Sequence, residues 1–306
     1  EDLERSKSPR RPGPIRFAVS EDVRFDLQNS GTWMDLPDGR MWRLVIEAPG
    51  AVSLSVGITR FDLPAGAKLW IYDPARKHVE GPYTTSHRSR QGSLWTPIIE
   101  GDEIVVEIFM PAGAAQPGII IGKANKGYRK MGKGGADKSH GACNNDVICP
   151  EGDPWRDQIR SVARYSIDGM FLCTGQLVNN TSVDFTPYFL SANHCNVSAA
   201  NDDTLVFYWN YVAPNCGDQG GGSLADNQTG AIFRAAYAPS DFLLVELTTD
   251  PDPSFNVFFT GWDANGTASA STVGIHHPSG DVKSISFNTN AVPSTSYGSD
   301  VVNATS

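Results

Sequence analysis

The sequence predicts an all-β protein, and three observations point to this fold class. Short runs rich in Val, Ile, Phe and Trp recur along residues 17–122. Turn signals such as Pro37-Asp38-Gly39 and Pro64-Ala65-Gly66 separate these runs. The runs follow one another at a spacing of roughly ten residues, which is typical of antiparallel sandwiches.

The expected strands follow in order along the first part of the chain. Each is a run of alternating apolar residues, and they span 17–20, 23–27, 41–49, 52–61, 68–73, 94–99, 102–111 and 118–122. Because β-branched and aromatic residues favour a pleated, half-buried surface, residues 17–123 are predicted to form an antiparallel β-sandwich of the jelly-roll type. The charged, proline-rich residues 1–16 are predicted to be a tail.

Composition excludes several classes of protein. Of the 306 residues, 40% are hydrophobic and 30 are glycine, which excludes wholesale disorder. No apolar run approaches the ~18 residues of a membrane-spanning helix, so no membrane is expected as a partner. The net charge of −9 argues against nucleic acid, because phosphate binding needs a basic face. Neither a basic nor an apolar leader follows Glu1, so a signal peptide is expected to be already absent.

The charge is unevenly divided between two parts of the chain. Residues 1–142 contain 20 Lys and Arg against 17 Asp and Glu, a net charge of +3. Residues 143–306 contain 5 against 17, a net charge of −12. These different compositions predict two domains, and chance drift within one domain is the alternative.

Residues 124–142 separate the two parts and are rich in Gly, Lys and Ser. Five basic residues lie between Lys126 and Lys138. This composition predicts a basic, flexible linker. Exposed linkers are preferred sites of proteolysis, and a merely solvated tether is the alternative.

All five cysteines lie in the second part: Cys143, Cys149, Cys173, Cys195 and Cys216. No C-x2-C pair occurs, so the spacing does not fit a zinc site. Disulfides formed in an oxidising compartment fit it better. The odd number leaves a free thiol, a bond to another chain, or a partner further along the polypeptide.

Two short motifs and one carboxylate suggest the chemistry. The motifs are FLCTGQLV at 171–178 and YFLSANHC at 188–195. A bridge between their cysteines would fix the backbone beside His194, and a catalytic base must be held within about 0.5 Å of its working position. Asp241 directly precedes the apolar run at 242–247. There its carboxylate can be buried and accept the Nδ1–H of the histidine.

These motifs resemble those of trypsin-like serine proteases. LSANHC is similar to the histidine motif of that family, CTGQLV to its cysteine-bearing strand and SDFLLVEL to its aspartate motif. The stretches 141–153, 206–211 and 273–280 resemble the bacterial lysyl-endopeptidase branch in particular. Residues 66–73 and 92–108 resemble the prosegment domain that precedes such catalytic domains.

The resemblance implies a fold and a set of site residues. Residues 143–306 would form a trypsin-like double β-barrel, with His194 as general base and Asp241 as its orienting carboxylate. The implied disulfides are Cys173–Cys195 and Cys149–Cys216, which leave Cys143 with its partner missing. No cofactor and no metal ion are expected.

The sequence departs from the family where the nucleophile is expected. The family has a serine in a G-[DS]-S-G loop after the aspartate, and nothing after Asp241 fits. Ser279 follows a proline, Ser299 lacks a following glycine, and Gly222-Ser223 precedes Asp241. We therefore expect a catalytic domain that is truncated at its C-terminus.

Two other pairs of residues invite a metal-site reading. Adjacent histidines in a strand point to opposite faces, so His276 and His277 are predicted to have structural roles. Asp202 and Asp203 are interpreted as a solvated turn, with a calcium site as the alternative.

The function predicted from these pieces is that of a secreted serine endopeptidase precursor. It would hydrolyse peptide bonds, and a preference for lysine is suggested by the resemblance alone. Residues 1–306 are expected to be inactive, because the serine loop is absent. The expected partners are a polypeptide substrate and an intramolecular contact between the prosegment and the catalytic domain. The alternatives are a catalytically dead homologue that binds proteins or carbohydrates and a structural secreted β-protein.

Overall fold

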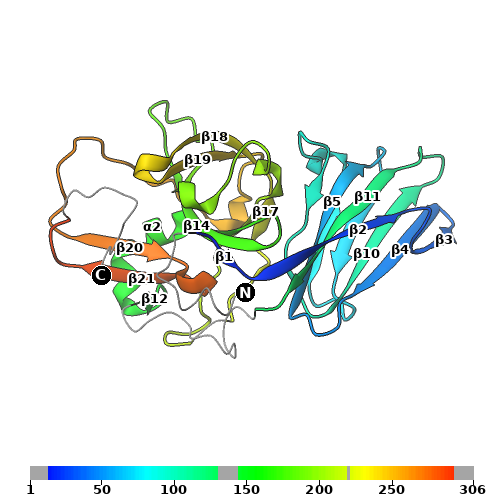
Figure 1. Ribbon diagram of the computed structural model, residues 1–306, viewed down its shortest axis with the longest axis horizontal. Helices are drawn as coiled ribbons and strands as arrows, with labels where there is room; N and C mark the ends of the chain where they lie inside the picture. Colours follow the sequence, from blue (N-terminus) through cyan, green and yellow to red (C-terminus); the bar gives the residue numbers. More distant parts are fainter. Residues whose placement is uncertain (1–12, 130–143, 219–220, 293–306) are drawn as a thin grey trace.

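A computed structural model describes residues 13–129, 144–218 and 221–292. Most of the regular secondary structure of the described residues is β-strand (Figure 1), which confirms the predicted all-β class. A sandwich of two sheets lies at one end of the molecule, an eight-stranded sheet curls beside it, and a three-stranded sheet lies beyond (Figure 1). Among the described residues, no helix has the length and apolar character needed to cross a membrane.

The sandwich consists of two five-stranded antiparallel sheets. The first has the order β3 (Thr32–Leu36), β4 (Gly39–Glu47), β10 (Glu103–Pro111), β6 (Lys68–Tyr72) and β7 (Val79–Tyr83). The second has the order β2 (Ala18–Asp26), β11 (Gly118–Gly127), β5 (Ser53–Asp62) and β8 (Leu94–Trp95), and β9 (Ile99–Glu100) also pairs with β5.

The predicted alternation explains how β10 packs. Its residues Ile104, Val106 and Ile108 are completely buried in the core between the two sheets, because every second side chain of a strand points to the same face. The predicted strand 94–99 is split into β8 and β9 around Pro97, since proline cannot donate a ladder hydrogen bond.

Two predicted boundaries of the sandwich need correction. Residues 124–127, assigned to the linker, form the end of β11 and pair with β5 and β2. Its alternation is not apolar, because Asn125 is buried on the face of β11 turned away from the sandwich core, beside Gly169 of the C-terminal half, and donates to Ser55 Oγ, 3.2 Å away. Ile15 and Arg16, assigned to the tail, form the short strand β1.

The eight-stranded sheet carries the predicted histidine and aspartate motifs. Its order is β17 (Asn227–Thr229), β16 (Val206–Tyr208), β13 (Val162–Ile167), β14 (Phe171–Val178), β15 (Tyr188–Ala192), β19 (Phe242–Leu247) and β18 (Ala231–Tyr237), and β1 (Ile15–Arg16) pairs with β14. Its core contains an aromatic stack in which Phe189 makes edge contacts with Tyr165, Phe207 and Trp209.

The remaining elements are short. The third sheet has the order β12 (Asn145–Asp146), β21 (Ser284–Asn288) and β20 (Thr272–His276). The helix α2 (Arg156–Ser161) follows a 3₁₀ segment, η2 (Pro150–Trp155). The other 3₁₀ turns are η1 (Thr85–His87), η3 (Asn193–Cys195), η4 (Asp202–Thr204), η5 (Ala238–Ser240), η6 (Pro253–Phe255) and η7 (Pro278–Gly280). We refer to residues 144–292 as the C-terminal module.

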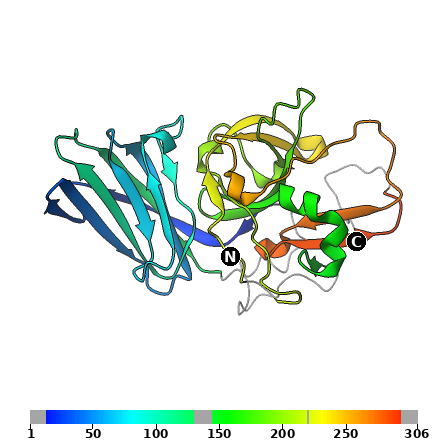
Figure 2. The same cartoon turned by 180° about the vertical axis from the view of Figure 1, so that it is seen from behind.

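The sandwich and the C-terminal module share a strand and an apolar cluster. Strand β1 pairs with the start of β14 through Ile15 and Leu172, then leads into β2 of the sandwich (Figure 2). The backbone N–H of Phe17 donates to the carbonyl oxygen of Met170 at 2.9 Å. A cluster of buried side chains joins the two parts: Phe17, Ala18, Trp95, Ile98, Leu172, Val206 and Tyr208.

Candidate active site

The register of strands β15 and β19 brings the two predicted catalytic residues together. Ala192, the last residue of β15, pairs with Phe242, the first residue of β19. His194 follows β15 by two residues and Asp241 directly precedes β19. The antiparallel pairing therefore places their side chains at the same end of the sheet, although 47 residues separate them in sequence.

Asp241 contacts His194 twice. Its Oδ2 lies 2.6 Å from the imidazole Nδ1, and its Oδ1 accepts the backbone N–H of His194 at 2.8 Å. The backbone carbonyl of Asp241 also accepts the N–H of Asn193 at 2.9 Å. Asp241 adopts a left-handed conformation with φ of 54°, which ends η5 and turns the chain into β19. The carboxylate thus fixes both the ring and the backbone of the histidine.

The imidazole leaves one nitrogen available. Within the described ranges, no hydrogen bond of His194 involves Nε2. The side chain is 35% exposed, whereas that of Asp241 is 20% exposed. A carboxylate that accepts Nδ1–H leaves Nε2 as the unprotonated, basic nitrogen. The pair can therefore accept a proton at Nε2 and stabilise the resulting imidazolium.

A disulfide and a hydrogen-bond chain anchor the backbone next to the histidine. Cys173 on β14 is joined to Cys195, with Cα atoms 6.2 Å apart. Ser191 Oγ donates to the carbonyl oxygen of Thr174 at 2.8 Å and lies 2.8 Å from the hydroxyl of Tyr165. Burial raises the pKa of Tyr165 well above its ordinary value, so this phenol stays protonated. Tyr165 is remote from both motifs, so the motifs did not predict this chain of hydrogen bonds.

The second disulfide joins Cys149 to Cys216, with Cα atoms 4.9 Å apart. Both pairs are those that the resemblance implied. Nearby, Asp146 Oδ2 accepts the N–H of Gly217 at 2.8 Å, a further link between the same two segments. Cys143 lies outside the described residues.

Of the three serines considered as nucleophiles, the structure describes Ser223 and Ser279, and neither forms a hydrogen bond with His194. Ser279 lies within η7 and has φ of 54°. Ser223 lies in an exposed segment and accepts the N–H of Ala225. Ser299 lies outside the described residues. Among the described residues, the candidate site therefore consists of His194 and the carboxylate of Asp241 that holds its ring.

His276 and His277 lie outside the candidate site, and His277 is packed in the protein interior. His277 is buried, and its Nδ1 lies 2.9 Å from the carbonyl oxygen of Asp281. Burial is the largest cause that lowers the pKa of His277 well below its usual value, and the positive charges of Lys283 and Arg164 lower this pKa further.

Across the described residues, the side chains close enough to share a metal ion are Cys173, His194 and Cys195. Both of these sulfurs are already in a disulfide.

The prediction of a solvated turn at Asp202 and Asp203 is wrong. The two residues are 1% and 7% exposed. Their carboxylates accept hydrogen bonds from residues 89–93 of the sandwich. Nothing in the local sequence could reveal this, because the donors are more than one hundred residues away.

Comparisons with known proteins agree with this architecture over most of the chain. The family described as "Lysyl endopeptidase, C-terminal domain" matches residues 137–305, and the family described as "Lysyl endopeptidase N-terminal domain" matches residues 3–121. A lysyl endopeptidase of Pseudomonas aeruginosa is 33% identical over 289 residues. The similarity covers 83% of this chain and 59% of the relative, so the chain spans less than two thirds of that relative's length. The C-terminal match contains the strands that hold His194 and Asp241 and covers more than half of the sequence, so the chain belongs to the lysyl endopeptidase family.

Proposed function

We propose that the C-terminal module is part of a serine endopeptidase of the trypsin-like type. The observation that carries this proposal is the double contact between Asp241 and His194. It fixes a tautomer with a free, basic Nε2, which is the state that general-base catalysis requires. The Cys173–Cys195 disulfide supports it by anchoring the residue that follows the histidine.

The proposed reaction is acyl transfer to water. His194 Nε2 takes the proton of a serine hydroxyl as its oxygen attacks the peptide carbonyl, and then gives that proton to the leaving amine. Water attacks the acyl-enzyme in the same manner, and the serine is restored. Residues 242–306 contain no G-[DS]-S-G sequence. We therefore expect residues 1–306 to bind no oxyanion and to hydrolyse no peptide by themselves.

Lysine is proposed as the residue before the cleaved bond. This specificity is suggested by the names of the matched families and by the distribution of lysine in the chain. Lys283 is the single lysine in residues 143–306, and it is 1% exposed. A lysine-directed protease would therefore find no accessible lysine in the described part of its own C-terminal module.

The sandwich is proposed to be a removable prosegment of a secreted protein. It precedes the C-terminal module and is joined to it through residues 128–143, which contain Lys130, Lys133 and Lys138. The disulfides Cys149–Cys216 and Cys173–Cys195 support an oxidising, extracellular compartment.

The gene beyond codon 306 tests the proposal. A G-[DS]-S-G loop in the extended reading frame supports a protease, and a stop codon supports a catalytically dead homologue. In the extended chain, we expect cleavage of a lysyl p-nitroanilide peptide and no cleavage of its leucyl counterpart.

Substitution of the histidine tests its role in the extended chain. His194→Ala should lower kcat by at least about 10⁴-fold, because a nucleophile without its base loses nearly all of its reactivity. His87→Ala, at an exposed histidine of η1, is the matched control and should keep full activity. Equal activity of the two variants would exclude His194 as the base.

A further inference from the structure

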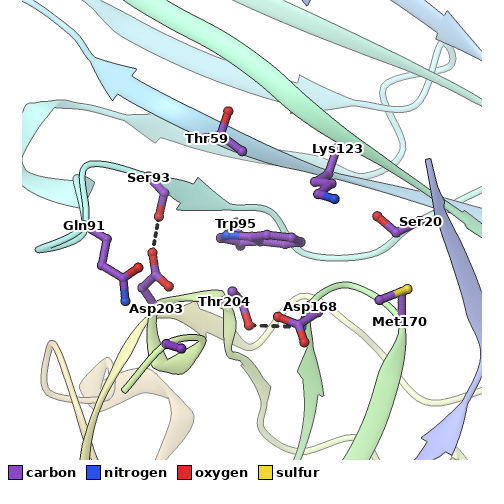
Figure 3. A pocket seen from close by; sticks show the side chains of 11 residues that line it. Ser20, Thr59, Gln91, Ser93, Trp95, Lys123, Asp168, Met170, Asp203 and Thr204 are labelled. Carbon is purple, nitrogen blue, oxygen red and sulfur yellow. Dashed lines mark hydrogen bonds between the residues drawn. The ribbon is translucent and has the colours of Figure 1, made fainter. Parts of the chain in front are cut away.

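The sandwich is bound to the C-terminal module through a pair of carboxylates. Asp203 Oδ2 accepts hydrogen bonds from Ser89 Oγ, at 3.2 Å, and from Ser93 Oγ. Figure 3 shows the bond from Ser93. Both hydroxyls belong to the loop between η1 and β8 of the sandwich. Every side-chain hydrogen bond of Asp203 therefore crosses from one part to the other.

The neighbouring carboxylate, Asp202, accepts hydrogen bonds both from the sandwich and from its own module. From the sandwich it accepts Arg90 Nη2 and Gln91 Nε2, each at 3.1 Å. From its own module it accepts the backbone N–H of Phe233 at 2.8 Å. Phe233 lies on β18, which pairs with β19, the strand that begins next to Asp241. Asp202 thus links the sandwich to the sheet that carries the catalytic pair.

Other contacts surround this acidic turn. Trp95 lies between the two parts (Figure 3), and its carbonyl oxygen accepts Thr229 Oγ1 at 2.9 Å. The N–H of Ile98 donates to the hydroxyl of Tyr208 at 3.0 Å. Burial raises the pKa of Tyr208 to about 12, which keeps this hydroxyl neutral. The contact therefore combines buried polar groups with the apolar cluster around Trp95.

The contact lies close to the catalytic histidine in sequence without covering it. The turn follows His194 by eight residues, and Ala199 between them accepts Gln91 Nε2 at 3.3 Å. In the described ranges, however, no hydrogen bond joins His194 or Asp241 to the sandwich. The imidazole remains 35% exposed with the sandwich in place.

We propose that the sandwich binds the C-terminal module at the Asp202–Asp203 turn as a partner that does not occlude the active site. It holds residues 199–203, which follow the catalytic histidine, and leaves the histidine open. This inference rests on the proposed function, since it takes His194 to be the general base. It implies that cutting the linker does not by itself release the sandwich, because the acidic turn, β1 and the apolar cluster all remain in contact.

Asp203 is the residue at which to test the contact. The side chain of Asp203 accepts its hydrogen bonds from the sandwich. Asp202 also accepts the N–H of Phe233, so its loss would disturb β18 as well. We would prepare the full chain with Asp203→Ala, and with Asp250→Ala as the matched control. Asp250 is exposed. A second variant, Ser89→Ala with Ser93→Ala, removes the same bonds from the other side and replaces Asp203→Ala if that chain does not fold.

The first measurement is the strength of the contact. Each folded chain is cut in the linker by added trypsin, the cut is located at residues 129–138 by mass spectrometry, and dissociation on dilution is followed by sedimentation velocity. The wild type and Asp250→Ala should dissociate alike. Asp203→Ala should raise the dissociation constant at least about tenfold, because it removes the carboxylate that accepts hydrogen bonds from both serine hydroxyls across the contact. Equal constants for Asp203→Ala and Asp250→Ala would refute the role of the acidic turn.

The second measurement is the accessibility of the histidine. Diethyl pyrocarbonate acylates unprotonated imidazole nitrogens, and peptide mapping gives the rate at each histidine. The rate at His194 should agree within about twofold between the intact chain and the separated C-terminal module. The exposed His87 and the buried His277 give the fast and slow references.

A tenfold rise at His194 on separation would show that the sandwich covers the histidine and would overturn the proposal. Neither measurement depends on peptide hydrolysis. The binding mode can therefore fail while the protease assignment stands, and the reverse also holds.

Discussion

The ammonium group of Lys283 donates a hydrogen bond to the carbonyl oxygen of Ile159, 2.9 Å away. This bond ties the segment before β21 to the helix α2, and the side chain is buried. Because burial disfavours the charged form, the pKa of Lys283 falls from its ordinary value of 10.5 to about 7. The single lysine of the C-terminal module therefore makes its stability depend on pH.

The first prediction is that stability rises with pH through this lysine. Between about pH 7 and 10.5 the unfolded chain binds a proton at Lys283 that the folded chain does not. The free energy of unfolding should therefore increase by up to about 1.4 kcal/mol per pH unit in this window and level off below it. Urea unfolding followed by tryptophan fluorescence at several pH values measures the slope.

Two variants isolate the contribution of Lys283. Lys283→Met removes the titrating group. The difference in the free energy of unfolding between this variant and the wild type should therefore change between about pH 7 and 10.5. Lys68→Met, at an exposed lysine of β6, should give a curve parallel to that of the wild type. If the Lys283→Met curve is also parallel, the buried lysine does not titrate as described.

The second prediction concerns the glycine of the CTG motif. A Cβ atom on Gly175 would lie 2.5 Å from the carbonyl oxygen of Leu190 and would also meet the ring of Phe189. Gly175→Ala should therefore lower the free energy of unfolding by about 1–3 kcal/mol through overpacking. Gly261→Ala is the control, because a Cβ there meets nothing within 4 Å. Equal thermal midpoints for the two variants would contradict the close approach of β14 and β15.

The third prediction separates the roles of the two disulfides. Replacing Cys173 and Cys195 by Ala opens a loop with a sequence separation of 22, which should cost about 3 kcal/mol on the chain-entropy model. Replacing Cys149 and Cys216 opens one of 67 and should cost about 4 kcal/mol. Denaturant unfolding measures both losses.

Of these two pairs, Cys173 and Cys195 lie beside His194. The NMR signals of the His194 ring should therefore shift when Cys173 and Cys195 are replaced and stay in place when Cys149 and Cys216 are replaced. Equal shifts in both variants would mean that the Cys173–Cys195 bond has no particular role in placing the ring.

The sequence predicted those parts of the fold that depend on local pattern. The apolar alternation of residues 102–111 predicted β10, whose inward residues fill the sandwich core. The same reasoning missed the end of β11, where Asn125 is buried against Gly169 of the C-terminal module and donates to Ser55 on the neighbouring strand. Whether a polar residue is buried in this way depends on tertiary contacts, which periodicity does not contain.

The candidate site and its surroundings likewise contain residues that local motifs predicted and residues whose environment depends on distant parts of the chain. His194 and Asp241 were predicted because each lies in a motif of its own, and the register of β15 and β19 brings them into contact. Asp202 and Asp203 were interpreted as solvated, because two acids in a polar loop normally are. Their burial depends on Arg90 and on the hydroxyl of Ser93, which belong to a distant part of the chain.

The fourth prediction concerns the tautomer of His194, the proposed general base. Asp241→Asn keeps the shape of the side chain but replaces an acceptor by an amide that can donate. The proton should then move from Nδ1 to Nε2 in a large fraction of the molecules, and ¹⁵N chemical shifts of the ring report this. In an extended chain with a serine, kcat should fall by about 10⁴-fold, as for other triads of this type. An unchanged tautomer would contradict the assignment of Asp241 as the orienting carboxylate.

The last prediction is that processing at lysine takes place in the linker and spares Lys126. This lysine belongs to β11, where its backbone is paired with Leu54 and Val19 and its Nζ donates to the carbonyl oxygen of Pro49 at 3.0 Å. A protease must bind its substrate as an extended strand, and a central strand of a sheet is unavailable for this. In the extended, serine-containing chain, changing Lys130, Lys133 and Lys138 to Gln should therefore block cleavage between the sandwich and the C-terminal module, whereas Lys126→Gln should leave that cleavage unchanged. Mass spectrometry of the new N-terminus follows both. Cleavage at the original rate and position in the triple variant would show that lysine does not direct the cut. Cleavage after Lys126 would show that the end of β11 opens before processing.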